Sequence, residues 1–149
     1  MGSDGIKVII FDLQGEYYAA DIREVERILD YRCETKMPDA PTFVKGVINY
    51  EEQILPIIDL YSKFKLGLNE VSKNSKIIVV KRDEKKFGIL VDNVYEVSDI
   101  SMDFFEEAPE IAVTLTKSYI KGLIRLDNKI VIFLNISEIL NEEDEEQIF

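Results

Sequence analysis

The sequence contains no histidine and only one cysteine, Cys33, among its 149 residues. Without histidine the chain has neither a Ser-His-Asp nor a Cys-His catalytic arrangement, and it offers a metal ion no imidazole ligand. A single cysteine forms neither a thiolate cluster nor an internal disulfide. We therefore expect no catalytic residues, no metal site and no cofactor.

Long apolar runs and positive charge are also scarce. No stretch reaches the roughly 20 consecutive apolar residues that a membrane-spanning helix needs, and residues 1–5 lack the basic and apolar regions of a signal peptide. The 18 Lys and Arg residues stand against 29 Asp and Glu residues, which gives a net charge of −11. Such a chain repels nucleic acid and anionic lipid. The sequence predicts a cytoplasmic protein that binds neither nucleic acid nor the membrane directly.

The two ends of the chain are expected to lie outside the folded part. Residues 1–5 read as a disordered N-terminus or as residues left over from cloning. Residues 142–149 begin with five consecutive acidic side chains, and we expect them to form a frayed, solvated acidic tail. The folded region is then predicted to span residues 6–141.

The apolar residues, 46% of the chain, follow a pattern that occurs twice. Residues 6–13 and 17–20 predict a β-hairpin, and residues 77–80 and 87–91 repeat it 69 positions later, so that Lys7 matches Lys76. Residues 43–60 match residues 119–136 at an offset of 76, and each stretch ends at a helix-capping residue, Asp59 or Asn135. These matches indicate an internal duplication, with copies near residues 6–66 and 75–141.

Each copy supplies about five short strands with little helix between them. Successive parallel strands need a crossover helix, so the pattern favours small antiparallel sheets. We predict a mostly β protein built from two small five-stranded barrels in tandem, which share one core because a unit of roughly 60 residues is marginal alone. Short helices are expected at residues 60–64, at 136–140, and after Asp21, whose spacing to Glu24 is that of a capping box.

Two features leave alternatives open. Gly46 and Gly122 lie within predicted strands, where a glycine marks either a bend of the barrel or a groove that another protein enters. Residues 102–113, the extra stretch of the second copy, are apolar and must either cover a core or meet a partner. The acidic pairs at 51–52 and 106–107 lie in turns, where water keeps carboxyl groups unsuited to acid-base catalysis at neutral pH.

Several motifs taken together resemble the CheW family of bacterial chemotaxis coupling proteins. They are Phe-Val-Lys-Gly-Val-Ile-Asn at residues 43–49, Ile-Leu-Pro-Ile-Ile-Asp-Leu at 54–60, Gly-Ile-Leu-Val-Asp-Asn-Val at 88–94, Ala-Pro-Glu at 108–110 and Tyr-Ile-Lys-Gly at 119–122. The resemblance spans residues 8–141. It implies two SH3-like β-barrel subdomains and an adaptor without catalytic activity, which joins the cytoplasmic tips of chemoreceptors to the regulatory domain of the chemotaxis histidine kinase in arrays at the membrane.

The resemblance also assigns partners to residues. It places a receptor helix in an apolar groove, and the receptor-binding residues it implies are Val25, Ile28, Gly46, Ile54 and Val97. It assigns the kinase to a loop and to a strand end, and the kinase-binding residues it implies are Ala108, Pro109, Glu110, Ile111, Phe87 and Gly88.

The chain departs from the family at Glu51-Glu52, where an Arg-Gly pair is common. A left-handed turn in residues with side chains costs about 1 kcal/mol, unless the turn has changed type. The reversed charge leaves two alternatives within the family: a coupling module of a non-flagellar chemosensory pathway, or a detached coupling domain of the CheV type. A small ligand-binding barrel is the alternative from another class.

Overall fold

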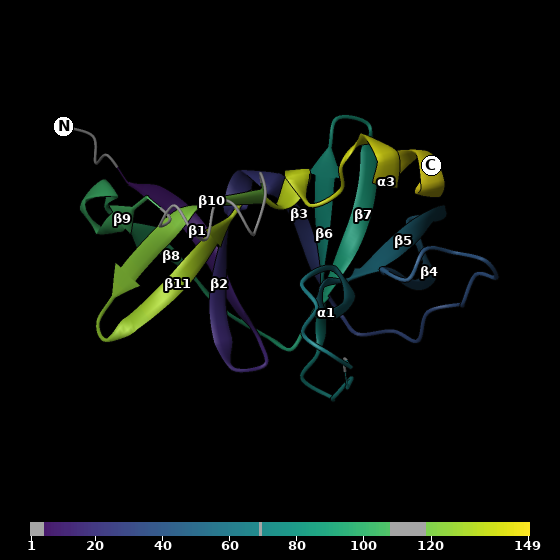
Figure 1. The fold of residues 1–149 in the computed structure, drawn as a ribbon, viewed down its shortest axis with the longest axis horizontal. Helices are drawn as coiled ribbons and strands as arrows, with labels where there is room; N and C mark the ends of the chain where they lie inside the picture. Colours follow the sequence, from purple (N-terminus) through teal and green to yellow (C-terminus); the bar gives the residue numbers. More distant parts are fainter. Residues whose placement is uncertain (1–4, 69, 108–118) are drawn as a thin grey trace.

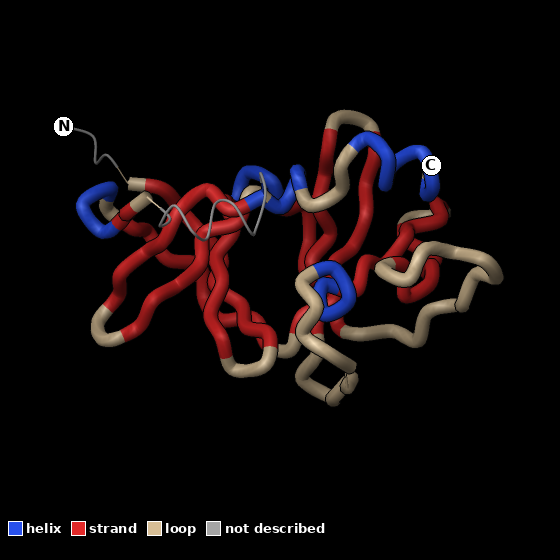
Figure 2. The backbone as a smooth tube through the Cα atoms, in the orientation of Figure 1, coloured by secondary structure: helices blue, strands red, loops and turns tan. Residues whose placement is uncertain are grey.

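The computed structural model describes residues 5–68, 70–107 and 119–149, which form mostly short strands (Figures 1 and 2). The strands of the first half are β1 (Ile6–Leu13), β2 (Glu16–Asp21), β3 (Val25–Asp30), β4 (Val44–Tyr50) and β5 (Gln53–Asp59). Those of the second half are β6 (Lys76–Arg82), β7 (Lys85–Val91), β8 (Asn93–Ile100), β9 (Phe105–Glu106), β10 (Ile120–Leu126) and β11 (Lys129–Leu134). The helical turns are η1 (Ile22–Glu24), α1 (Leu60–Lys63), η2 (Met102–Phe104), η4 (Ile136–Glu138) and α3 (Glu142–Ile148).

The strands form two sheets, and each sheet takes strands from both halves of the chain. One sheet has six strands in the order β8-β1-β2-β11-β10-β9, and the other has five in the order β3-β6-β7-β5-β4. The expected mostly β architecture of two small sheets with short helices is confirmed. The halves do not fold as separate units in tandem, however, because the hairpin that opens each half joins the sheet formed mainly by the other half.

The exchanged hairpins are related by symmetry. Ile9 of β1 pairs with Val97 of β8, and the equivalent positions, Ile78 and Ile28, pair in the other sheet. The parallel contacts repeat in the same way, since β5 pairs with β7 in one sheet and β11 pairs with β2 in the other. This is the pattern that an internal duplication predicts, with each hairpin donated to the partner copy.

The buried apolar residues form three clusters. The shared cluster lies between the sheets and includes Phe11 and Leu134 from one sheet with Ile78 and Phe87 from the other. Each of the two smaller clusters lies inside one curled sheet, on the side away from the shared cluster. The side chains of β6 alternate between two of these clusters. Ile78 and Val80 belong to the shared cluster, and Ile77 and Val79 belong to the smaller cluster of their own sheet. The prediction of a common core is confirmed.

The predicted helix after Asp21 is replaced by one helical turn and a strand. Asp21 does cap η1, since its carboxylate accepts a hydrogen bond from the backbone N–H of Arg23 at 2.9 Å. Glu24 turns away from the cap and accepts a hydrogen bond from the backbone N–H of Ser137 at 3.0 Å. The residues from Val25 onward then form β3 and pair with β6. The apolar spacing also fits a helix, but Val25 and Ile28 are β-branched and favour a helix only weakly, so pairing with β6 decides the structure.

Of the two other predicted helix caps, one forms and one does not. Asp59 caps α1 through the backbone N–H of Tyr61 at 3.1 Å, as expected. Asn135 makes no side-chain cap for η4 and instead accepts a hydrogen bond from the Ser137 hydroxyl at 3.2 Å.

The acidic run belongs to the helix α3, Glu142–Ile148, and the expectation of a frayed tail is wrong. Asn141 and Asp144 make a complete capping box at its start, and Asp144 is buried. The four acidic residues of the first turn also lie at the positive end of the helix dipole, where negative charge is stabilising. The acidic run therefore begins a helix, because Asn141 caps it and because Lys63 and Arg82 pair with its carboxylates.

Candidate protein-binding surfaces

Two edge strands carry exposed aliphatic side chains at equivalent positions. Ile28 on β3 is 37% exposed and Val97 on β8 is 48% exposed. Their pairing partners, Ile78 and Ile9, belong to the shared core. Successive strands present paired residues on the same face, so Ile28 and Val97 extend the two facing apolar surfaces outward to a sheet edge. Val25, at the start of β3, pairs with Val80 and is half-buried against the same core.

Gly46 is buried and serves the fold. A β carbon at this position would lie 2.5 Å from the carbonyl oxygen of Thr35 and 2.7 Å from the Cγ of Glu34. Thr35 crosses β4 at that point, bonded in both directions to Val47 at 2.8 and 2.9 Å. The sequence left two interpretations of Gly46, a bend in the strand or a groove for a partner. The structure shows the bend, because the backbone at Thr35 fills the space beside Gly46. Gly122 is equivalent and admits the carbonyl oxygen of Glu106.

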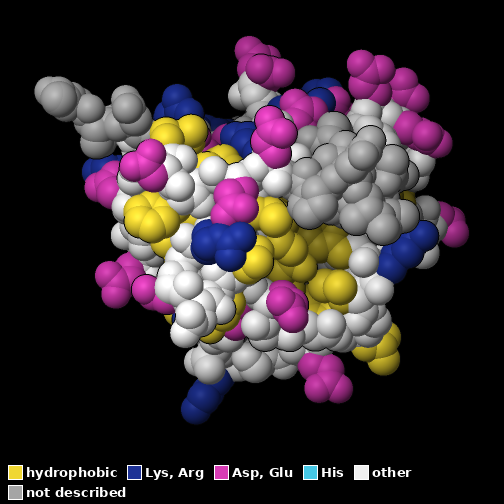
Figure 3. All heavy atoms as spheres, turned by 60° about the vertical axis from the view of Figure 1, so that its left-hand side comes forward, with side chains coloured by type: hydrophobic (Ala, Val, Ile, Leu, Met, Phe, Trp, Pro, Cys, Tyr) yellow, Lys and Arg dark blue, Asp and Glu magenta, His cyan; other side chains and the backbone are white. Residues whose placement is uncertain are grey.

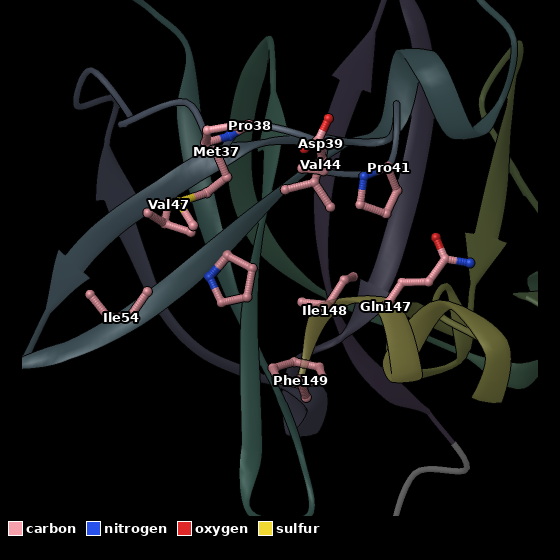
Figure 4. A pocket seen from close by; sticks show the side chains of 12 residues that line it. Met37, Pro38, Asp39, Pro41, Val44, Val47, Ile54, Gln147, Ile148 and Phe149 are labelled. Atoms are coloured by element: carbon pink, nitrogen blue, oxygen red, sulfur yellow. The ribbon is translucent and has the colours of Figure 1, made fainter.

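Ile54 lies in a different surface feature from Ile28 and Val97. Its side chain is 72% exposed and lines an open groove of about 370 Å³ (Figure 4). The walls come from β4, β5, the loop before β4 and the end of α3, and they comprise Met37, Pro38, Asp39, Ala40, Pro41, Val44, Val47, Ile54, Pro56, Gln147, Ile148 and Phe149. None of the other four predicted receptor residues lines this groove.

The predicted kinase-binding residues fall into two groups. Phe87 and Gly88 are buried in β7, where a β carbon on Gly88 would meet the Ile77 side chain at 2.7 Å. They pack the interior and do not themselves form a surface. Residues 108–111 lie outside the described residues.

The hairpin tip between β4 and β5 keeps a left-handed turn without glycine. Glu51 and Glu52 both have positive φ, at 50° and 63°. The Glu51 carboxylate lies 3.3 Å from the guanidinium of Arg27, whose carbon stands 5.7 Å from the centre of the Tyr50 ring. The negative charge at the tip is thus matched by a cation of this chain. Sequence reasoning missed this partner, because it assigned Arg27 to a helix.

A charged cluster surrounds Tyr50 beside this tip. The Tyr50 hydroxyl donates to Glu26 at 2.7 Å, and Lys86 lies 3.0 Å from the same carboxylate. Burial, together with the bond to Glu26, raises the pKa of Tyr50 to about 12. The bonds from Tyr50 and Lys86 lower the pKa of Glu26. The phenol therefore stays protonated and the carboxyl stays ionised at neutral pH, which is the behaviour of a fixed polar contact.

A second polar cluster marks the chain's crossing between the sheets. Asp92 accepts from the Tyr61 hydroxyl at 2.5 Å, and Asp12 accepts from Tyr95 at 3.0 Å and from the Asn93 amide at 3.0 Å. Burial, followed by the bond to Asp12, raises the pKa of Tyr95 to about 12. Both phenols act as donors: Tyr61 bonds from α1 to the junction between β7 and β8, and Tyr95 joins β8 to β1 within one sheet. Among the described residues no group of three carboxylate or thiol side chains is placed to hold a metal ion.

The outer surface mixes apolar patches with charge. Figure 3 shows hydrophobic side chains gathered in the middle of one face, with acidic and basic side chains around them. Single exposed apolar residues are normal, whereas gathered ones mark sites of protein contact. Over the described residues, no helix has the length and apolar character to cross a membrane.

Comparison with known proteins agrees with this architecture. The family described as CheW-like domain matches residues 7–144. The chain is 36% identical to the chemotaxis protein CheW of Klebsiella aerogenes, over 94% of this chain and 84% of that protein. It is 28% identical to the protein PilI of Pseudomonas aeruginosa, over 83% of this chain and 69% of that one.

A solved structure shares the fold. The scaffolding protein TtCheW from Thermoanaerobacter tengcongensis superposes with a TM-score of 0.86 at 31% sequence identity, and the match covers 97% of this chain and 98% of that one. The family match spans nearly all of the residues whose sheets, exchanged hairpins and shared core are described above. This chain belongs to the CheW-like domain family.

Proposed function

We propose that this protein is a cytoplasmic, non-catalytic adaptor that couples the tips of chemoreceptors to the regulatory domain of a chemotaxis histidine kinase. The observation that carries the proposal is the pair of exposed aliphatic side chains, Ile28 and Val97, at equivalent edges of the two sheets in a CheW-like fold. Association with receptor arrays at the membrane then comes through these partners.

The receptor site is proposed to centre on Val25, Ile28 and Val97. A receptor helix that presents apolar side chains at positions i, i+3 and i+7 needs aliphatic surface against which to bury them. Ile28 and Val97 supply it where the shared core reaches the surface, and Val25 anchors the strand beneath. Gly46 supports the neighbouring hairpin from inside, and Ile54 offers an exposed apolar side chain on the groove beside it.

The kinase site is proposed to include Ala108, Pro109, Glu110 and Ile111, on the resemblance to the family alone. A second contact is proposed at the start of β7, whose position Phe87 and Gly88 hold by packing in the core. The two lysines that precede Phe87 are already paired within the chain, Lys85 with Glu145 and Lys86 with Glu26, so the proposed contact rests on the strand end itself.

A coupling role in a non-flagellar pathway, or as a detached domain of the CheV type, is the second candidate. The similarity to PilI supports this candidate, whereas the charge of Glu51 is matched within the chain by Arg27. A ligand-binding barrel is disfavoured, because side chains of the two smaller clusters fill the interior of each sheet.

Substitution of exposed edge residues tests the receptor site. Val97→Asp and Ile28→Asp each place a charge where a partner must remove water, and we expect each to weaken binding of a receptor cytoplasmic fragment at least tenfold. The matched control is Ile130→Asp, which changes an aliphatic side chain that is 51% exposed and outside the proposed site. Titration calorimetry measures all three. Equal losses from the three variants, or an equal loss of kinase binding, would contradict the assignment.

A further inference from the structure

Helix α3 is held to the rest of the fold by paired charges. Asp144 lies 2.5 Å from Lys63, and both side chains are largely buried. Glu145, on the next position of the helix, lies 3.2 Å from Arg82 and 3.7 Å from Lys85. Three cations from two separate elements, α1 and the β6–β7 hairpin, therefore converge on two successive carboxylates.

The end of the same helix is apolar and enters the groove beside Ile54. Ile148 and Phe149 form one wall of that groove, opposite Val44, Val47 and the exposed Ile54 (Figure 4). Ile148 also packs against the shared core, and the Lys85 ammonium stands 5.4 Å from the centre of the Phe149 ring. Phe149 keeps 47% of its surface exposed. The groove is thus occupied along one side and open along the other.

The spacing of these contacts defines a recognition pattern. Asp144 and Glu145 precede Ile148 and Phe149 by four residues, so one turn of helix brings each carboxylate above an apolar side chain. The rest of the fold pairs Lys63, Arg82 and Lys85 with these carboxylates, and it presents the apolar groove to Ile148 and Phe149. Charge complementarity and an amphipathic helix in a groove are together a general mode of protein recognition.

We propose that the surface formed by Lys63, Arg82, Lys85 and the Ile54 groove is a helix-docking site, which α3 occupies along one side. The occupant in a complex is an amphipathic helix of a partner protein that carries two acidic residues one turn before two apolar ones, and it binds by displacing α3. This site includes Ile54 but lies apart from Ile28 and Val97, the centre of the proposed receptor site, and it does not depend on that assignment.

The experiment uses the full-length protein and a synthetic peptide with the sequence of residues 141–149, labelled with a fluorophore. A release variant, Asp144→Lys with Ile148→Ser, places a cation against Lys63 and removes an apolar anchor. We expect the peptide to bind this variant at least tenfold more tightly than it binds the wild type. Adding Ile54→Asp to the release variant removes peptide binding, because it changes the groove without touching α3.

Two further measurements complete the test. Amide NMR spectra of β4 and β5 check that the release variant is folded, and Phe149→Ser alone provides a milder opening if it is not. The proposal is overturned if the wild type and both opened variants bind the peptide equally or not at all, or if Ile54→Asp leaves binding unchanged. It is also overturned if the wild type forms a dimer that Ile54→Asp dissociates, because the occupant is then a second copy of this chain.

Discussion

Replacing Gly46 with alanine tests what its missing side chain provides. The added β carbon would lie 2.5 Å from the carbonyl oxygen of Thr35, whereas ordinary contacts begin near 3.4 Å. The segment through Thr35 therefore has to withdraw by roughly 1 Å, and the two hydrogen bonds that join it to Val47 weaken or break. Each such bond contributes about 0.5–1.5 kcal/mol, so we expect the free energy of unfolding to fall by about 1–3 kcal/mol.

Urea denaturation of Gly46→Ala measures this loss. Thermal unfolding measures it independently, because each kcal/mol lost lowers the Tm by about 2–4 °C. Asn49→Ala is the matched control, since Asn49 is exposed on the same strand, and we expect it to change stability by less than about 0.5 kcal/mol. The reasoning fails if Gly46→Ala is as stable as the wild type but no longer binds the receptor fragment. That result would place Gly46 in a groove that the partner enters.

Three further predictions concern the turn and the caps. Glu52→Gly is expected to raise the free energy of unfolding by about 0.5–1 kcal/mol in urea titrations, because the residue has a left-handed backbone that glycine adopts without strain. Glu51→Arg is expected to cost about 0.5–1 kcal/mol at low salt and less at 1 M salt, because it sets two guanidinium groups together at Arg27. The side-chain bond from Arg23 lowers the pKa of Asp21, so this carboxylate stabilises the fold above its unfolded pKa of about 3.9 and loses that effect as the pH falls through the lower folded value. Asp21→Asn should therefore be less stable than the wild type at pH 7 in urea, with a difference that shrinks toward pH 2.

The local pattern of the sequence predicted the hairpins well. Nearly continuous apolar segments on either side of Gln14-Gly15 predicted β1 and β2, and their repeat predicted β6 and β7. The cap at Asp59 and the matched Lys-Gly pairs at positions 46 and 122 were equally visible, because a turn, a cap or a bulge is set by a few neighbouring residues.

Long-range pairing could not be predicted in the same way. Nothing near Ile28 in the sequence says that its strand pairs with Ile78 of the other copy, and the same residues also fit a helix. The docking of α3 depends on Lys63 and Arg82, which lie far from the acidic run in the chain. The partner of Glu51 was missed for the same reason, since Arg27 reaches it only after the sheet has closed.

The most direct test of the proposed adaptor role is a titration of the full-length protein with the kinase regulatory domain and a receptor cytoplasmic fragment from the same genome. Calorimetry is expected to show a 1:1 complex with the kinase domain, and analytical ultracentrifugation to show a ternary complex after the receptor fragment is added. The absence of any complex at high micromolar concentrations of both partners would contradict the role proposed for this protein.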